Sequence, residues 1–382
     1  MSLYLDYNAS APISKAALDS MIDVYQNTIG NSDSRTHTYG DQARQVVETA
    51  RRQVANLIGV KPGEVVFTSG ATESNNMALL GLQEYANSTG RKHIITSQIE
   101  HKSILEAAHY LTEHGFDVDF VAPDSNGVIH TADILALLRP DTLIVSLMHV
   151  NNETGAIQPV KELGETLSKT DTLFHIDATQ SLGKLIQEVK DLKYDMLSVS
   201  AHKIEGPQGI GALILRKKRY KFPPIKPILF GGQQEKGIRP GTVPVALTAG
   251  FGAACQEINE KSYQNRAQTT ALRQILFDEL KDSGLNFEIN GDVETSIPST
   301  INLYFPNVNS EALMLAGKAV CSVSNGSACN SNSYKPSYVL SAMGFSEDRI
   351  QCSVRISWGS DTNKKEFKEA IGQLFRIAKE LQ

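Results

Sequence analysis

Residues 195–211 read DMLSVSAHKIEGPQGIG, an apolar strand that runs into a lysine and then into a glycine-rich turn. We expect the strand at 196–200, which places Lys203 just beyond its end. In an open α/β sheet, ligands bind at the carboxyl ends of the strands. A lysine that is desolvated at such a point can form a Schiff base, although a lysine can also simply follow a buried strand. The rest of the chain has to decide between these two interpretations.

Strands and helices alternate on both sides of this stretch. We predict strands at 64–68, 93–96, 118–121, 143–147, 172–177, 196–200 and 210–215, with helices at 71–85, 102–113 and 160–167. This alternation indicates an α/β fold with a mostly parallel, seven-stranded sheet and helices on both faces. From about residue 260 the pattern changes to a long helix, short strands at 300–304 and 353–358, and a closing helix from Lys364. It predicts a smaller α+β domain.

Composition excludes several classes of protein. The 382 residues are 41% hydrophobic and 21% charged, with a net charge of −5, so nothing in the overall charge favours nucleic acid. The first residues have neither the basic region nor the apolar core of a signal peptide, so we expect none there, and no apolar run approaches the roughly 20 residues that span a bilayer. The four cysteines include no CxxC pair, which argues against a disulfide framework or a structural metal site. We therefore expect a cytoplasmic protein without membrane or direct nucleic-acid partners.

Three other strand ends carry polar groups. SGATES at 69–74 precedes a helix, where free N–H groups and the Thr72 hydroxyl suit a phosphate, or merely cap the helix. Asp177 suits a protonated ring nitrogen, or an N-cap. NNETG at 151–155 offers amides for a cofactor oxygen, or forms a plain turn. Together with Lys203, these are the parts that a pyridoxal phosphate (PLP) site requires.

The segment SNGSACNSNS at 324–333 surrounds Cys329 with small, polar residues. It cannot bury apolar area, so we expect it to be mobile and its thiol to be exposed. Reactive cysteines are usually partly exposed, whereas structural ones are buried. The segment is either a reactive loop or a surface loop with an incidental cysteine.

These motifs resemble those of the cysteine desulfurases of the NifS/IscS type, in the class-V aminotransferase family. The resemblance rests on YLDY at 4–7, the loop from Gly30, SGATES at 69–74, EHK at 100–102, HVNNETG at 149–155, HIDATQSLGK at 175–184, SAHKIEGPQGIGAL at 200–213, RPGTVPV at 239–245 and SNGSACNSNSYKPSYVL at 324–340. It implies PLP-dependent fold type I, similar to aspartate aminotransferase. Residues 15–260 would form the large PLP-binding domain. Residues 1–14 and 261–382 would form the small domain, which carries the Cys329 loop.

The resemblance also implies roles for individual residues. Lys203 would bind PLP covalently, Asp177 would pair with the pyridine nitrogen, and His101 would stack on the ring. Contacts to the ring oxygen and the phosphate would come from Ala71, Thr72, Asn152, Gln180, Ser200, His202 and, from a neighbouring subunit, Thr242. Arg355 would bind the substrate carboxylate with its planar fork, supported by Asn31. The protein would be a homodimer.

The implied reaction converts L-cysteine to L-alanine and leaves a persulfide on Cys329. Lys203 would move the α-proton, and the Cys329 thiolate would attack the substrate sulfur, with His101 a candidate for lowering the pKa of the thiol. The persulfide would pass to an acceptor protein for iron–sulfur cluster assembly, tRNA thiolation or DNA phosphorothioation. Since the sequence ends at Gln382 without the tail by which housekeeping members engage an iron–sulfur scaffold, the acceptor stays open.

Two alternatives accompany this interpretation. Another fold type I enzyme, such as an aminotransferase or a selenocysteine lyase, would share Lys203 and Asp177 but would not need Cys329. A non-catalytic subunit of a sulfur-transfer complex would have lost Lys203 or Cys329, and both are present.

Overall fold

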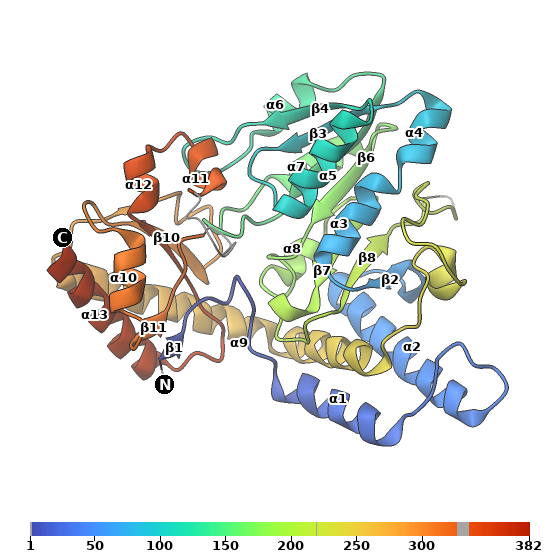
Figure 1. The fold of residues 1–382 in the computed structure, drawn as a ribbon, viewed down its shortest axis with the longest axis horizontal. Coiled ribbons are helices and arrows are strands. Elements are labelled where there is room, and N and C mark those ends of the chain that lie inside the picture. Colours follow the sequence, from blue (N-terminus) through green and yellow to red (C-terminus); the bar gives the residue numbers. More distant parts are fainter. Residues whose placement is uncertain (1, 219, 327–335) are drawn as a thin grey trace.

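The computed structural model describes residues 2–218, 220–326 and 336–382 (Figure 1). Cys329, the predicted nucleophile, lies outside the described residues. Within them, no helix is long and apolar enough to cross a membrane. The strands are β1 (Leu3–Tyr4), β2 (Val65–Thr68), β3 (His93–Ser97), β4 (Asp117–Val121), β5 (Thr142–Met148), β6 (Leu173–Asp177), β7 (Met196–Ser200), β8 (Gly211–Leu215), β9 (Glu288–Ile289), β10 (Thr300–Tyr304), β11 (Cys321–Ser322) and β12 (Ser353–Ser357).

Helices of 5 to 39 residues connect these strands. The longer ones are α1 (Lys15–Asn27), α2 (Thr38–Ile58), α3 (Ala71–Leu80), α5 (Lys102–Glu113), α7 (Val160–Leu167), α9 (Val245–Ser283) and α13 (Lys364–Leu381). The shorter ones are α4 (Gln83–Thr89), α6 (Thr131–Ala136), α8 (Ile186–Lys190), α10 (Ser310–Ala316), α11 (Tyr338–Ala342) and α12 (Glu347–Gln351), with 3₁₀ turns at Pro62–Glu64, Ala201–Lys203 and Gln234–Gly237.

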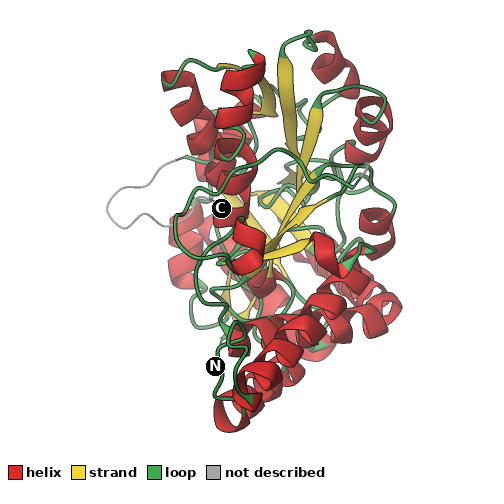
Figure 2. Ribbon diagram, turned by 90° about the vertical axis from the view of Figure 1, so that its right-hand side faces the viewer, coloured by secondary structure: helices red, strands yellow, loops and turns green. Residues whose placement is uncertain are grey.

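The large sheet has seven strands in the order β2-β8-β7-β6-β5-β3-β4. All neighbouring strands are parallel except β8, which is antiparallel to both β2 and β7. Every residue of β2, β3, β5, β7 and β8 is buried, as expected for a sheet covered on both faces. Figure 2 shows the strands between helices on either side. The predicted fold class is confirmed.

Side chains of successive strand residues enter two different cores, because the side-chain period of a strand is two. Phe67, Ile95 and Ile214 belong to a cluster with residues of α2, α7 and α9. Their neighbours in sequence, Val66, Ile94 and Leu213, belong to a cluster with residues of α3, α4 and α5. The two layers of helices therefore hold the sheet, and the strand ends with it, in a fixed position.

One predicted helix is broken in the structure. The expected helix at 71–85 ends at Leu80, and α4 begins at Gln83. At Gly81 a Cβ atom would lie 2.4 Å from the carbonyl oxygen of Met77 and 2.9 Å from that of Lys226. The Gly81 carbonyl accepts a hydrogen bond from the Lys226 N–H at 2.8 Å. Lys226 thus takes the carbonyl that would otherwise continue the helix, and its close approach leaves room only for glycine at position 81.

The second core is built from both ends of the chain. β12, β10 and β9 form an antiparallel sheet, and β1 pairs in parallel with β11. Their buried residues pack with α13 and with the C-terminal half of α9, and both termini lie at this side of the molecule (Figure 1). The helix α9 has 39 residues and contributes Ile258 to the first core and Leu272 to the second. The domain boundary at residue 260, within α9, stays a prediction.

The edge strand β2 is covered by a buried ion pair. Arg51 donates to the carbonyl oxygen of Val65 at 2.9 Å, and Glu235 accepts from the Phe67 N–H at 2.8 Å. Arg51 and Glu235 are joined by two hydrogen bonds of 2.8 and 2.7 Å. These side chains take the place of a further strand, since an exposed edge would leave backbone groups free to pair with another chain.

Candidate active site

The carboxyl ends of four strands meet at one edge of the large sheet. Thr68 ends β2 and Ser200 ends β7, and both lie opposite Gly211, the first residue of the antiparallel strand β8 between them. Asp177 of β6 pairs with Met148 of β5. These ends open onto a pocket of about 710 Å³. The predicted site residues that line it are Ala71, Thr72, His101, Asn152, Asp177, Gln180, Ser200, His202, Lys203 and Arg355.

Lys203 lies in the 3₁₀ turn that follows β7 and lines the pocket. Its Nζ donates to the carbonyl oxygens of Asn8 and Ala9, both at 2.6 Å. Burial, and next the charge of Arg355, lower the pKa of the amine from 10.5 to about 8. A lysine with a lowered pKa is partly unprotonated near neutral pH, which is the form that acts as a nucleophile.

Asp177 ends β6 and is buried at the base of the pocket. Its Oδ2 accepts from Asn75 Nδ2 at 2.8 Å, and its Oδ1 accepts from the Thr179 N–H at 2.9 Å. Two hydrogen bonds from neutral donors hold the carboxylate in place without neutralising its charge. A protonated ring nitrogen is a suitable partner for this charge.

His101 is the N-cap of α5, and this role fixes its ring. Its Nδ1 accepts from the Ser103 N–H at 3.1 Å, so the neutral ring carries its proton on Nε2. Burial is the largest influence on its pKa and lowers it, the charge of Asp177 opposes this, and the charges of Lys203 and Lys102 lower the pKa further, so that the net shift is downward. The structure therefore presents a neutral imidazole to the pocket.

The N-terminus of α3 forms one end of the pocket. Gly70 precedes it with φ of 150°, a value that favours glycine, and leads into the first turn with Ala71 and Thr72. The first N–H groups of a helix lack acceptors within the helix and point towards a bound anion. Ser200 lies beside this turn, since a Cβ at Gly70 would be 3.6 Å from its Oγ. This end of the pocket is suited to a phosphate.

Arg355, on β12, brings a cation from the second core into the same pocket. It is 5% exposed, and it donates through Nη1 to the Asn152 carbonyl oxygen at 3.0 Å and through Nη2 to Asp6 Oδ1. Its Nε is buried and has no hydrogen-bond partner among the described residues. A donor without an acceptor at this place suits a ligand carboxylate.

The residues present fit PLP. Two further buried atoms of the pocket, Asn152 Oδ1 and Thr179 Oγ1, lack partners within the described part of the chain. A buried polar group without a partner lowers stability unless something bonds it. These two polar atoms, the anion site at α3, the carboxylate of Asp177 and the amine of Lys203 together match the polar groups, the phosphate, the ring nitrogen and the aldehyde of this cofactor.

Two predicted residues lie outside the pocket. Asn31 is exposed on the loop between α1 and α2, where its Oδ1 accepts from the Asp33 N–H at 2.9 Å. Arg44 donates to two carbonyl oxygens of this loop and holds it closed. The structure thus does not bring Asn31 to Arg355 within one chain. Thr242 is also exposed and does not line the pocket.

Sequence reasoning gave no role to several residues that the structure places at the site. Asn8 is 3% exposed, lines the pocket and accepts from Lys203. Asp6 pairs with Arg355, and Asn75 bonds Asp177. Asp6 and Asn75 lie within or beside the quoted motifs YLDY and SGATES, and that proximity was the only signal that could have found them.

The fold and the pocket define a PLP-dependent enzyme of fold type I. Residues 3–369 match the Aminotransferase class-V family, and the chain belongs to it, within its cysteine desulfurases. It is 42% identical to the cysteine desulfurase IscS of Vibrio cholerae serotype O1 (strain M66-2), over 99% of this chain and 93% of that protein.

Two solved structures are similar over nearly the whole chain. A NifS-like protein has a TM-score of 0.90 and 35% identity, and covers 99% of each chain. SspA in complex with cysteine has a TM-score of 0.81 and 34% identity, over 93% of this chain and 98% of that one. The family predicted from the motifs is confirmed, whereas the roles of individual residues stay predictions.

Proposed function

We propose that this protein takes sulfur from L-cysteine as a persulfide on Cys329, releases L-alanine, and passes the sulfur to an acceptor protein. The observation that carries the proposal is the meeting of Lys203, Asp177 and Arg355 in one pocket. The solved neighbour SspA was obtained in complex with cysteine, which supports the same substrate here.

Each residue has a task in this proposal. Lys203 and the N-terminus of α3 hold PLP, and Asp177 keeps its ring nitrogen protonated. When bound, PLP withdraws electrons from the substrate α-carbon. Arg355 orients the substrate carboxylate, and the Lys203 amine removes and returns a proton at the α-carbon. His101 covers the ring and is the candidate base near the thiol.

The nucleophile is assigned to Cys329 by its sequence context and by the other cysteines. Burial raises the pKa of Cys255 and raises that of Cys321 to about 12, so neither forms a thiolate readily. Cys352 is only partly buried, but its pKa is raised as well, and none of these three lines the pocket. The Cys329 thiolate would attack the substrate sulfur, break its bond to carbon and keep it as the persulfide.

The test is turnover of the purified protein with L-cysteine and a thiol reductant, which should yield alanine and sulfide in equal amounts. Cys329→Ala should retain the absorbance of bound PLP and lose sulfide production, whereas Cys352→Ala should keep both. Full turnover in Cys329→Ala would contradict the persulfide, and a 2-oxo acid in place of alanine would favour an aminotransferase of the same fold. The acceptor can be found by labelling with ³⁵S-cysteine and capturing the proteins that receive the labelled sulfur. Their identity would distinguish cluster assembly, tRNA thiolation and DNA phosphorothioation as destinations of the sulfur.

The proposal includes a homodimer in which Thr242 reaches the phosphate of the neighbouring subunit. Its support is the exposure of Thr242 in a segment that is anchored beside the N-terminus of α3, because Arg239, three residues earlier, donates to Glu73 in the first turn of that helix at 2.7 Å. Mixing Lys203→Ala and Thr242→Ala chains should recover about a quarter of wild-type sites, because half of the random dimers carry one intact site. No recovery on mixing would show that both residues serve one chain.

A further inference from the structure

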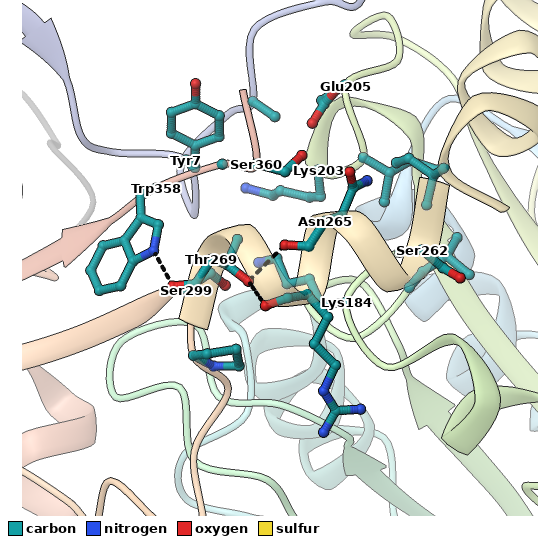
Figure 3. Close-up of a pocket in the computed structure, with 18 residues that line it drawn as sticks. Tyr7, Lys184, Lys203, Glu205, Ser262, Asn265, Thr269, Ser299, Trp358 and Ser360 are labelled. Carbon is teal, nitrogen blue, oxygen red and sulfur yellow. Dashed lines mark hydrogen bonds between the residues drawn. The ribbon is translucent and has the colours of Figure 1, made fainter. Parts of the chain in front are cut away.

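A second lysine, Lys184, lies close to the site. It follows β6 in the turn before α8, and with Lys203 it lines a cavity of about 70 Å³ that also contacts Trp358 and Glu205 (Figure 3). Lys203 borders both this cavity and the larger pocket. The reaction as described has no use for Lys184.

The contacts of Lys184 are directed at two side chains. Its Nζ donates to Gln180 Oε1 at 2.8 Å and to Asn8 Oδ1 at 3.1 Å. Burial, and next the charge of Lys203, lower the pKa of Lys184 from 10.5 to about 7. An uncharged amine still has two N–H groups, so both hydrogen bonds persist on either side of that pH.

These contacts fix the orientation of the Gln180 amide. Gln180 Nε2 donates to the Asn8 carbonyl oxygen at 3.0 Å, while Oε1 accepts from Lys184. If the amide were reversed, an oxygen would face a carbonyl oxygen and an NH₂ would face an amine. An amide nitrogen has two N–H groups, so one is left for the large pocket, which Gln180 lines.

Asn8 carries the same constraint to the rest of the site. Its carbonyl oxygen accepts from Lys203 as well as from Gln180. Its Nδ2 donates to the Asn152 carbonyl oxygen at 3.0 Å and to Thr300 Oγ1 at 2.9 Å. Lys184 thereby holds a side chain that connects both cores of the molecule.

We propose that Lys184 is a positioning residue, which fixes the Gln180 amide and the Asn8 side chain so that Gln180 donates to the ring oxygen of PLP. The inference rests on the proposed function in that PLP is the group bound. Lys184 acts only through its neighbours and touches no reacting atom.

The test is the binding of two ligands to cofactor-free protein, PLP and its analogue without the ring hydroxyl, 3-deoxypyridoxal phosphate. Lys184→Met should weaken the binding of PLP about tenfold, the effect of one well-placed hydrogen bond, and leave the analogue's affinity unchanged. Lys193→Met, on an exposed side chain that lines neither cavity, is the control and should change neither affinity. In a Gln180→Ala background, Lys184→Met should have no further effect.

If Lys184→Met weakened the binding of both ligands equally, Lys184 would have only a structural role and the proposal would be overturned. An unchanged affinity for PLP would overturn it as well. The neutral Lys184→Gln variant, a smaller change, should give a smaller effect in the same direction, and it replaces Lys184→Met if that variant does not fold. If the wild-type protein bound no PLP, the proposed function itself would fail, which is a different outcome.

Discussion

The buried pair of Arg51 and Glu235 permits a quantitative prediction. Their side chains are 9% and 4% exposed, and Glu235 also accepts from the Phe67 N–H. Glu235→Ala removes the buried counter-ion of Arg51, which leaves only the half-exposed Glu48 to face its guanidinium, and it frees an N–H on the sheet edge. Removing one partner of a buried ion pair costs about 3–5 kcal/mol in the free energy of unfolding. We expect Glu235→Ala to lose that amount.

Glu48 supplies a matched control because it contacts the same guanidinium. It accepts from Arg51 Nε at 3.0 Å, but its side chain is 47% exposed. An exposed ion pair contributes about 0–1 kcal/mol, so Glu48→Ala should hardly change stability. The double variant Arg51→Met with Glu235→Met should recover most of the loss, since an apolar pair removes the buried charge as well.

Hydrogen exchange at the Phe67 amide is the sharper assay, because a chain with two cores need not unfold in one step. A loss of 3–5 kcal/mol corresponds to exchange about 150- to 5,000-fold faster. Urea unfolding gives the global value. If Glu235→Ala changed exchange at Phe67 no more than Glu48→Ala did, the ion pair would not hold the edge strand.

Three other predictions concern the pocket and its surroundings. Asp177→Asn should keep PLP bound but lower turnover about 100-fold, because a neutral amide cannot stabilise a protonated ring nitrogen; turnover near the wild-type rate would contradict this role. In cofactor-free protein, ¹⁵N NMR should find His101 with its proton on Nε2 and with a pKa below 6.5, and an Nδ1–H tautomer would refute the N-cap assignment. Burial raises the pKa of Glu153 from 4.5 to about 7, so the folded protein binds the proton more tightly than the unfolded chain does. The free energy of unfolding therefore falls as the pH rises from 4.5 to about 7. Glu153→Gln should remove a loss of about 3 kcal/mol across that window, measured by urea unfolding at each pH, and an unchanged pH dependence would argue against it.

The sheet and most of the pocket were predictable from the sequence for one physical reason. Parallel strands place their carboxyl ends at one edge, so polar groups at the ends of apolar runs must gather there. Asp177 and Lys203 were found in this way, and both line the pocket. Arg355 came from the family resemblance alone, because it lies within a strand of the second core.

Contacts between distant parts of the chain were not predictable. The meeting of Asn8 with Lys184 depends on two segments 176 residues apart, and no local pattern reports it. The end of α3 at Gly81 depends equally on the approach of Lys226. Asn31 was expected near Arg355 from the family resemblance, which tells which residues are present but not how far apart they lie. In the structure, hydrogen bonds within the loop between α1 and α2 keep Asn31 away from the pocket.

The contacts between the first residues of the chain and β12 determine when the site can form during synthesis. Asp6 and Asn8 are among the first residues made, yet their partners Arg355 and Ser357 each lie 349 residues later. At about 5–20 residues per second, the ribosome needs roughly 20–70 s to supply them. The large sheet can be complete long before that, with Lys203 still lacking the carbonyl groups that accept from its amine. The chain should therefore become able to bind the cofactor only at the end of translation. A chain that is interrupted before β12 should not bind the cofactor and so should not withdraw it from complete chains.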